Sequence, residues 1–413
     1  MHILYFHQYF TTPNTAGGTR SYEMARQLIS RGHEVTMVCV RRGKDGLNLL
    51  GSADGLIREG VIDGIRVIQF DLEYSNYMSL PRRAWVFLRY ALRSTGLALL
   101  MDYDLLFATS TPLTAGIPGI FASPLRRKPF VFEVRDLWPE LPKAMGVVKN
   151  PLVLSGRSVL AWMSYRTASA FIALAPGLKE GIAKRSPRNH AIAMIPNGCD
   201  LDLFQPGKRE ALNLPGVKPT DCVAVFTGAH GMANGLDAVL DTARVLKERG
   251  RMDIVLVFIG DGKLKPSLIE RTKAEDLDNC RFFDPMPKNI LNRVVSCCDI
   301  GMMILDDVPA FYYGTSPNKF FDYISSGLPV LNNYPGWLAD MINKHRCGIA
   351  IPPRNPEAFA DTLCLLADDP VLRREYGKNA RLLAEEKFSR DRLANEFVDW
   401  LEAVYAKSRD KVA

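Results

Sequence analysis

The chain has 413 residues, of which 47% are hydrophobic and 23% charged; this composition excludes a disordered chain and leaves room for two domains. The formal net charge of +7 is unevenly distributed. Residues 1–195 contain 24 Lys and Arg against 14 Asp and Glu (24 − 14 = +10), whereas the remainder has 52 − 24 = 28 against 45 − 14 = 31, or −3. We therefore expect the first half to face an anionic partner.

We find little sign in the sequence of a secretory signal, a membrane-spanning helix or a metal-binding set of cysteines. Met1 and His2 run directly into an apolar strand, so we expect no secretory signal. The longest uncharged stretch, 107–125, contains three prolines, which favours a loop and a broken helix of a soluble domain over a helix that spans a bilayer. The eight cysteines have no metal-binding spacing, and we expect them to be buried or incidental thiols of a reducing cytoplasm.

The first half alternates strand and helix signals. A strand at 3–6 leads through a loop with Gly17 and Gly18 into a helix expected at about 20–30. A second helix pattern, basic and amphipathic, covers 80–100. Further strands are expected at 34–40, 66–70, 105–109, 130–134 and 170–175.

The same alternation begins again near residue 220. A strand at 222–228 precedes a helix at about 236–248. Later strands are expected at 253–262, 281–284, 299–305, 329–333 and 348–352. Strands that alternate with helices of about 10–15 residues predict parallel, doubly wound α/β sheets, here in two domains whose cleft holds a ligand at the carboxyl ends of the strands.

A turn-rich stretch at 195–207 separates the two halves. We expect an N-terminal domain at 1–195 and a second domain at 196–387. The remaining segment, 388–413, is expected to form a helix that returns to the first domain.

The most informative segment is 314–330, GTSPNKFFDYISSGLPV. It predicts a loop, a helix that begins near Pro317, and a turn into a strand. Ser316 or Thr315 is expected to cap the helix. Free backbone N–H groups and the helix dipole at such a helix start suit a phosphate group.

Two charged residues in this helix extend the phosphate hypothesis. Lys319 adds a positive charge, and Asp322, one turn later, is placed to reach a ribose hydroxyl. Together they suggest a nucleotide-linked substrate. The alternative is an ordinary amphipathic helix with Phe320, Phe321 and Ile324 in the core.

Several motifs occur in one order along nearly the whole chain: Gly17-Gly18 before a helix, RGHEV (31–35), IPNGCD (195–200), FTGAHGMANGLD (226–237), FIGDG (258–262) and PNKFFDYISSGLPV (317–330). This order resembles the retaining glycosyltransferases of family 4. The resemblance implies the GT-B fold, in which two Rossmann-like domains face a cleft. EVRDLWPE (133–140) and YYGTSPNKFFDY (312–323) resemble a bacterial subgroup that builds surface polysaccharides and includes O-antigen N-acetyl-L-fucosamine transferases.

The resemblance implies that the second domain binds most of a nucleotide-sugar donor. Gly228 opens the loop expected to approach the diphosphate. The family usually has Arg and Lys in this loop, whereas His230 and Asn234 stand nearest those places here, so Lys319 or Arg135 is expected to supply the charge. A purely structural loop is the alternative.

The FIGDG turn and the family's paired glutamates complete the implied donor site. Gly260 and Asp261 are expected near the base and ribose, or to form only a tight turn. The glutamate that binds ribose in the family is Asp322 here, and the one that contacts the sugar is Gly314. Backbone N–H groups of Gly314, Thr315 and Ser316 are expected to replace the missing carboxylate in a pocket suited to a deoxy or acetamido sugar. Asn318 is a further expected donor-binding residue.

On the first domain, the resemblance places Gly17 and Gly18 near the donor phosphate and the acceptor, although a flexible surface loop would have the same composition. Arg135 and Asp136 follow the strand 130–134, where an active site belongs. They are expected to hold a donor phosphate or an acceptor hydroxyl, or to form a structural ion pair. Arg135, Asp136 and Lys319 are the predicted catalytic group.

Retention of configuration implies a reaction in which the departing diphosphate oxygen takes the acceptor proton, so that the protein mainly positions groups and neutralises charge. No DxD motif lies in a suitable loop. We therefore expect neither a metal ion nor another cofactor.

The segment 80–100 combines arginines with aromatic and apolar residues, and its candidate membrane or acceptor contacts are Arg82, Arg83, Trp85, Arg89 and Arg93. Such a helix suits an anionic membrane surface. A polyprenyl-diphosphate-linked saccharide acceptor would explain both its charge and its apolar residues. The alternative is an ordinary helix with a solvated basic face; nucleic acid is not expected, because no recognition motif is present.

The sequence thus predicts a cytoplasmic enzyme, peripheral on the inner membrane, that transfers a sugar from a nucleotide-sugar, UDP-linked by expectation, in O-antigen or capsule synthesis. Two alternatives remain open. One is a nonhydrolysing UDP-sugar epimerase of the same architecture, and the other is a non-catalytic nucleotide-sugar binder at the membrane.

Overall fold

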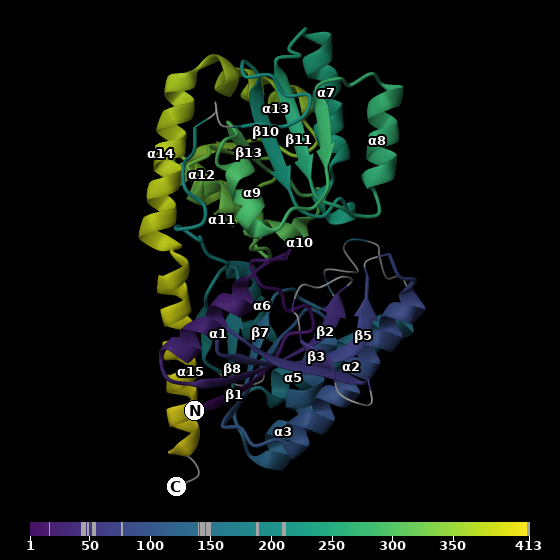
Figure 1. Cartoon of the computed structure of the whole chain (residues 1–413), viewed down its shortest axis with the longest axis vertical. Helices are drawn as coiled ribbons and strands as arrows, with labels where there is room; N and C mark the ends of the chain where they lie inside the picture. The colour runs from purple at the N-terminus through teal and green to yellow at the C-terminus, as the bar shows by residue number, and fades with distance from the viewer. Residues whose placement is uncertain are drawn as a thin grey trace. The chain divides into compact units, whose positions relative to one another are not determined.

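The computed structural model describes residues 1–15, 17–42, 47, 49–51, 55–75, 77–138, 140, 145, 150–186, 190–208 and 212–410. The chain divides into two compact units (Figure 1). Unit 1 comprises Met1–Pro196 and Asp391–Ala413, and unit 2 comprises Asn197–Arg390.

Unit 1 is built on a nine-stranded sheet with the order β3-β4-β5-β2-β1-β6-β7-β8-β9. All neighbours from β5 to β9 are parallel, and only β3–β4 and β4–β5 are antiparallel. The strands are β1 (His2–Phe6), β2 (Glu34–Arg42), β3 (Leu50–Gly51), β4 (Ile57–Ile62), β5 (Ile65–Tyr74), β6 (Leu105–Thr109), β7 (Phe130–Val134), β8 (Ala170–Ala173) and β9 (Ile192–Met194). Every strand expected in this half is present. The sequence did not predict β3, β4 or β9, because β3 and β9 have only two and three residues and β4 is not fully buried at any position.

The helices of unit 1 are α1 (Arg20–Ser30), α2 (Leu80–Leu100), the short 3₁₀ helix η1 (Leu113–Gly116), α3 (Ile117–Arg126), α5 (Pro151–Thr167), α6 (Pro176–Arg185) and α15 (Arg390–Arg409). The stretch 107–125, expected to be a loop and a broken helix, contains the end of β6, η1 and nearly all of α3. Among the described residues, no helix combines the length and apolar composition needed to cross a bilayer.

Helix α15 lies beside α1 (Figure 1). Gln27 Nε2 donates to Asn395 Oδ1 at 2.8 Å, and the Arg31 guanidinium pairs with Glu402 at 2.8 Å. The Phe397 ring packs edge-on against Phe107 of β6, with ring centroids 5.1 Å apart. The C-terminal helix thus covers a face of the unit 1 sheet.

Unit 2 has six parallel strands in the order β12-β11-β10-β13-β14-β15. They are β10 (Cys222–Thr227), β11 (Ile254–Ile259), β12 (Cys280–Phe283), β13 (Ile300–Met303), β14 (Val330–Asn332) and β15 (Gly348–Ala350). This is the doubly wound order of nucleotide-binding sheets, in which ligands bind at the carboxyl ends of the strands. β10, β11 and β13 are buried throughout, as expected for strands covered on both faces.

The helices of unit 2 are η3 (Met232–Asn234), α7 (Asp237–Glu248), α8 (Lys265–Ala274), α9 (Lys288–Val295), α10 (Pro309–Tyr312), α11 (Asn318–Ser325), α12 (Trp337–His345), α13 (Pro356–Asp368) and α14 (Pro370–Lys387). Helix α11 is buried from Lys319 to its end at Ser325. All eight cysteines are free thiols, and seven of them are buried.

Candidate functional site

Two loops at the carboxyl ends of β10 and β11 lie directly against each other. Gly260 has φ of 152°, and a Cβ there would lie 1.9 Å from the Gly228 carbonyl oxygen. A Cβ at Gly262 would lie 2.4 Å from the His230 carbonyl oxygen. Only glycine allows this backbone contact. The glycines of the FIGDG motif therefore hold the loop 228–235 in place.

Lys319 of α11 reaches this loop. Its Nζ donates to Asn234 Oδ1 at 2.6 Å and lies 4.0 Å from the centroid of the Phe226 ring. A Cβ on Gly228 would lie 3.6 Å from Nζ, so the glycine and the amine face each other. The structure thus brings together three of the predicted donor residues, Gly228, Asn234 and Lys319.

The Lys319 amine has no opposite charge beside it. Within the described residues, no carboxylate forms an ion pair with it, and only 9% of the residue is exposed. Burial lowers the pKa of Lys319 to about 7. An arriving anion would supply the missing negative charge and restore the protonated form.

His230 is placed differently from the other loop residues. Its ring is fully buried among Phe226, Phe258 and Phe282, with centroid distances of 6.0 to 6.4 Å. Burial lowers its pKa to about 4, so the imidazole is neutral near pH 7. A buried, neutral ring does not offer the positive charge that the loop was expected to need, and we assign His230 to the core beneath the site.

The expected cap of α11 is wrong. The helix begins at Asn318 with extended Pro317 as its N-cap, and neither preceding hydroxyl caps it. The Thr315 hydroxyl donates to the Phe311 carbonyl oxygen at 2.9 Å, and Ser316 Oγ accepts the Asn197 backbone N–H at 3.0 Å. Both hydroxyls are used to fix the loop that precedes the helix.

The start of α11 retains unused polar groups. Asn318 Oδ1 is buried and has no hydrogen-bond partner among the described residues. The first amides of an α-helix have no carbonyl partner within the helix and carry the positive end of its dipole. Gly314 lies tightly against α10, because a Cβ there would be 2.5 Å from the Ala310 carbonyl oxygen. The preceding loop is thus fixed by its own backbone contacts.

Asp322 belongs to a buried charge cluster that the sequence did not reveal. Lys288 Nζ lies 2.6 Å from Asp200 Oδ2 and 3.3 Å from Asp322 Oδ1, and Arg390 Nε lies 2.6 Å from Asp200 Oδ1. Two cations thus face two carboxylates. We call these four residues, Asp200, Lys288, Asp322 and Arg390, the buried charge cluster.

The members of the cluster titrate differently. Burial alone would raise the pKa of Asp200, but Arg390 and Lys288 hold it well below its usual range. Burial raises the pKa of Asp322, an effect that Lys288 opposes. Burial acts to lower the pKa of Lys288, but Asp322 and Asp200 outweigh it and raise the pKa. Lys288 therefore keeps its proton and orients Asp322.

Asp261 of the FIGDG turn is exposed, and its Oδ1 accepts the Gly262 backbone N–H at 2.8 Å. This is the local side-chain bond of a tight turn. The Asp261 backbone carbonyl oxygen accepts the His230 N–H at 2.9 Å, which joins the turn to the loop 228–235.

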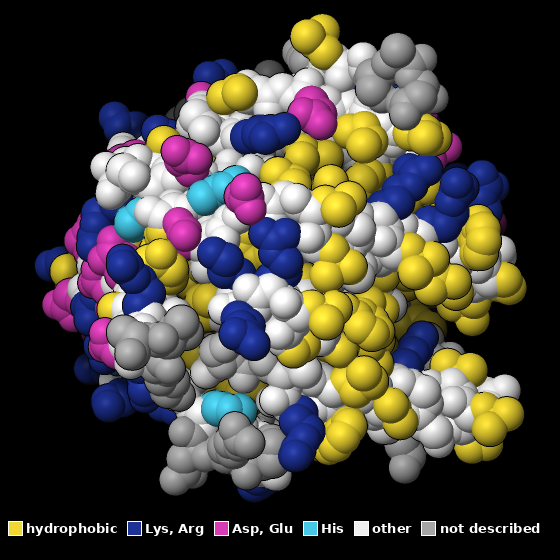
Figure 2. Space-filling view, turned by 90° about the horizontal axis from the view of Figure 1, so that it is seen from below, with side chains coloured by type: hydrophobic (Ala, Val, Ile, Leu, Met, Phe, Trp, Pro, Cys, Tyr) yellow, Lys and Arg dark blue, Asp and Glu magenta, His cyan; other side chains and the backbone are white. Residues whose placement is uncertain are grey.

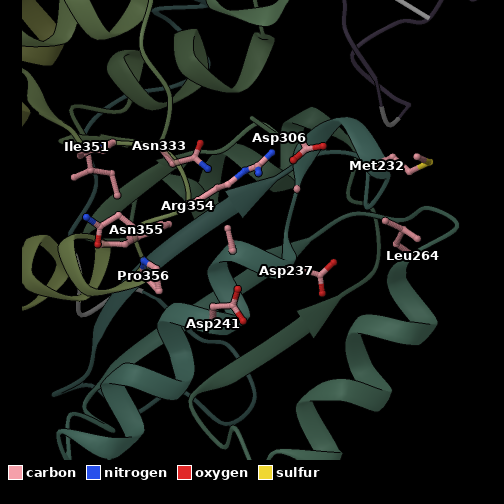
Figure 3. Close-up of a pocket in the computed structure, with 14 residues that line it drawn as sticks. Met232, Asp237, Asp241, Leu264, Asp306, Asn333, Ile351, Arg354, Asn355 and Pro356 are labelled. Atoms are coloured by element: carbon pink, nitrogen blue, oxygen red, sulfur yellow. The ribbon is translucent and has the colours of Figure 1, made fainter. Parts of the chain in front are cut away.

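A cavity of about 490 Å³ opens on the other side of this loop, between the starts of α7 and α13 (Figure 3). Met232 of the loop lines it, with Asp237 and Asp241 of α7. Both carboxylates already pair with Arg271. Within the described ranges, no three His, Cys, Asp or Glu side chains are grouped so as to hold a metal ion.

Unit 1 has a second group of charged residues at the end of β7. Fully buried Glu133 pairs with Arg20, the first residue of α1, at 2.8 Å. Arg135 Nε donates to Glu133 Oε1 at 3.1 Å and to Thr109 Oγ1 at 2.7 Å. Arg135 therefore forms its ion pair with Glu133, two residues before it in the chain.

Of the predicted residues of unit 1, Arg135 reaches the start of α1. Arg135 Nη2 lies 3.4 Å from Ser21 Oγ, so the end of β7 touches the first turn after Gly17 and Gly18. Gly17 has φ of 154°, and the Gly18 carbonyl oxygen accepts the Thr11 hydroxyl at 2.9 Å. Burial raises the pKa of half-buried Asp136.

The arginines of α2 lie over aromatic rings. The Arg89 guanidinium lies 5.8 Å from the Trp85 ring centroid, Arg93 lies 5.7 Å from Phe70, and Arg83 lies 5.9 Å from Tyr74. Trp85 is exposed, as is Arg82 at the helix start. These residues therefore form part of the molecular surface.

Two domain families match the chain. Residues 15–198 match the family described as "Glycosyl transferase 4-like domain", and residues 221–369 match "Glycosyl transferases group 1". The two halves of the chain therefore match two glycosyltransferase domains, one after the other.

Solved structures confirm the GT-B fold. Sucrose-phosphate synthase from Thermosynechococcus elongatus superposes with a TM-score of 0.76 and 16% identity, over 98% of this chain and 99% of that chain. The HepE protein of Anabaena, in complex with UDP and glucose, gives a TM-score of 0.71 and 15% identity over 98% and 100%. WaaG, a glycosyltransferase involved in lipopolysaccharide biosynthesis, gives a TM-score of 0.68 and 16% identity, over 96% of this chain and 98% of that chain.

Curated relatives match about half of the chain or less, and the two described next have names that differ from the predicted subgroup. A D-inositol 3-phosphate glycosyltransferase of Corynebacterium glutamicum is 26% identical over 204 residues, 46% of each chain. An alpha-D-kanosaminyltransferase of Streptomyces kanamyceticus is 24% identical over 168 residues, 40% of this chain and 42% of that protein. The chain spans about half the length of the curated relatives it matches.

Proposed function

We propose that this protein is a retaining glycosyltransferase that moves a sugar from a UDP-sugar to a polyprenyl-diphosphate-linked saccharide at the cytoplasmic face of the inner membrane, in O-antigen or capsule synthesis. The observation that carries the donor assignment is the Lys319 amine, buried and without a carboxylate partner beside Gly228 and Asn234. A buried amine without a counter-charge is stabilised in its charged form when an anion binds beside it.

The diphosphate of the donor would lie between the loop 228–235 and the start of α11. Lys319 would neutralise it, and Asn318 and the free amides of the first helical turn would donate to it or orient it. These groups stabilise the charge that develops on the leaving diphosphate. The departing oxygen would then take the proton of the acceptor hydroxyl, so that no protein base is required.

Asp322 would bind the ribose of the donor. Lys288 Nζ lies 3.3 Å from its Oδ1 and orients the carboxyl group, and Asp322 lies one turn after Lys319 on α11. The HepE structure is a complex with UDP and glucose, and a trehalose-6-phosphate structure from E. coli is bound with UDP-2-fluoro glucose, which supports a uridine nucleotide here.

The proposed sugar and acceptor rest on Gly314 and on likenesses to two other transferases. Gly314 stands where the family's sugar-binding carboxylate is expected, which suits a deoxy or acetamido sugar such as N-acetyl-L-fucosamine. The kanosaminyltransferase likeness is compatible with an amino sugar, and the WaaG likeness with lipopolysaccharide synthesis. Arg135 and Asp136 of unit 1 remain the proposed acceptor-side residues.

A binding panel tests the donor site. We expect UDP to bind the wild-type chain, uridine to bind far more weakly, and Lys319→Met to lose about 10- to 100-fold in UDP affinity, the contribution of a hydrogen bond to a charged group. Exposed Lys344→Met, which makes the same charge change on α12, is the matched control. Equal binding of uridine and UDP would refute a diphosphate site at Lys319.

A further inference from the structure

Three neighbouring helices of unit 1 share an unusual composition. Helices α2, α3 and α5 contain seven arginines, four in α2, one in α3 and two in α5, and no Asp, Glu or Lys. Their summed charge of +7 equals the formal net charge of the whole chain, so the remaining residues are neutral in sum. Helix α3 packs against both α2 and α5, which places this charge on one continuous surface.

Each of the three helices also exposes an apolar stripe. On α2, Trp85, Leu88 and Leu92 are exposed at spacings of three and four residues, which is one helical face. These side chains point away from the buried residues of the same helix, such as Tyr90 and Ala91. A helix that only covers a sheet needs one apolar face. Helix α2 has a second one.

The stripes of α3 and α5 repeat this pattern. Phe121 and Leu125 of α3 are 48% and 70% exposed, four residues apart. On α5, Leu152, Val159 and Trp162 are exposed at spacings of seven and three. Figure 2 shows hydrophobic side chains gathered over a broad part of the face seen from below, with Lys and Arg among and beside them.

Several arginines border these stripes without a carboxylate partner. In the described part of the chain, Arg82, Arg89 and Arg166 form no ion pair. The Arg166 guanidinium lies 5.7 Å from the Trp162 ring centroid, as Arg89 does at 5.8 Å from Trp85. Arg126 is the exception, since it pairs with exposed Asp102 just after α2.

We propose that α2, α3 and α5 together form a docking surface for a bilayer rich in anionic phospholipid. We call it the three-helix surface. Its exposed apolar side chains would enter the boundary between headgroups and acyl chains, where tryptophan is favoured, and its arginines would bind lipid phosphates. A second copy of the chain is a poor occupant, because two copies of this face would bring Arg82, Arg89 and Arg166 of each against one another, and these charges repel.

The three-helix surface accounts for the basic first half of the chain, and it extends beyond the single helix 80–100 that the sequence identified. It does not depend on which sugar is transferred or on whether transfer occurs. The proposed lipid binding and the proposed sugar transfer can therefore be refuted separately, since lipid binding and UDP binding are measured independently.

The test is co-sedimentation of the full chain with vesicles. We expect binding to phosphatidylglycerol-containing vesicles, little binding to pure phosphatidylcholine, and release at high salt, because exposed charges are screened beyond about 10 Å at 0.1 M salt. Arg82→Gln/Arg89→Gln/Arg166→Gln should weaken binding about fivefold per arginine. Trp85→Ser/Leu125→Ser/Trp162→Ser should also abolish most binding.

The matched control is Leu365→Ser/Val371→Ser/Leu382→Ser, three exposed apolar residues of unit 2 that should leave vesicle binding unchanged. All variants alter exposed side chains, and unchanged melting temperatures verify that they fold. Equal binding to both kinds of vesicle, or equal losses in the control, would overturn the proposal. Conversion of a dimer to a monomer by the apolar variant would also overturn it, since the surface would then bind protein.

Discussion

At the scale of single residues, the proposed donor site depends most on Lys319. Its amine is held by Asn234 at 2.6 Å over the face of Phe226, without a counter-charge. A lysine in this state gains more from a bound phosphate than an exposed lysine does, because both the charge and the hydrogen bonds are formed away from water.

The lowered pKa of Lys319 predicts proton uptake on donor binding. With a pKa of about 7, the free amine is mostly neutral at pH 8, and a bound diphosphate returns it to the charged form. UDP titrations at pH 8 in buffers of different ionisation enthalpy should show uptake approaching one proton, and affinity should fall as the pH rises above 7. Lys319→Met should abolish the uptake while Lys344→Met preserves it.

The same shift affects stability with a definite sign. Burial places the folded pKa of Lys319 near 7, below its unfolded value, so the unfolded chain binds the additional proton between these values. The contribution of this residue to stability of the ligand-free protein therefore increases as the pH rises from about 7 toward 10. A melting series of wild type and Lys319→Met should show this difference; identical pH dependence in both would contradict the shifted pKa.

At the scale of structural elements, the packing of the loops after β10 and β11 depends on glycine. Gly260→Ala would place a Cβ 1.9 Å from the Gly228 carbonyl oxygen and force a backbone with φ of 152° onto an L-residue. We expect a loss of about 3 kcal/mol in unfolding free energy and weaker UDP binding. Gly231→Ala, in the same region but with no atom within 4 Å, should change little. Equal effects of the two substitutions in denaturant unfolding would refute this packing.

The buried charge cluster joins α9, α11 and the first residue of α15 to Asp200, near the start of unit 2. Lys288→Met should destabilise the protein by about 3–5 kcal/mol, because two buried carboxylates lose the cation between them. Adding Asp322→Asn should recover part of this loss. A double variant no more stable than Lys288→Met alone would show that Lys288 does not act through Asp322.

The sequence predicted the elements better than the partners of their side chains. Apolar strands and the helix over 317–325 were identified because burial on both faces leaves continuous apolar runs. Lys288, the first residue of α9, was missed because its partners Asp200 and Asp322 are 88 and 34 residues away in the chain. The sequence identified the loop glycines as candidate site residues, but the contact between Gly260 and Gly228 is visible only in the folded structure.

Some side chains are used locally in ways that their residue type does not indicate. Ser316 and Thr315 have the composition of a helix cap, yet their hydroxyls bond to Asn197 and Phe311. His230 occupies a place where the family usually has a basic residue, yet its ring packs among phenylalanines. Residue type indicates which bonds are available, and the fold decides which of them form.

At the scale of the whole molecule, the GT-B fold and the two glycosyltransferase domains define the class, while donor and acceptor remain proposals. We predict that transfer does not need a divalent ion, because Lys319 and the α11 helix start supply the positive charge on the diphosphate. Activity should be unchanged in EDTA. Loss of activity in EDTA that magnesium or manganese restores would contradict this charge assignment.

The most direct test is a transfer assay with a synthetic polyprenyl-diphosphate N-acetylglucosamine acceptor and a panel of UDP-, GDP- and dTDP-sugars that includes UDP-N-acetyl-L-fucosamine. We predict one lipid-linked product from one UDP-sugar, retained anomeric configuration, and a loss of rate in Lys319→Met but not in Lys344→Met. UDP binding without any product would favour a non-catalytic binder, and conversion of a UDP-sugar without acceptor would favour an epimerase. Either result would contradict the transferase account.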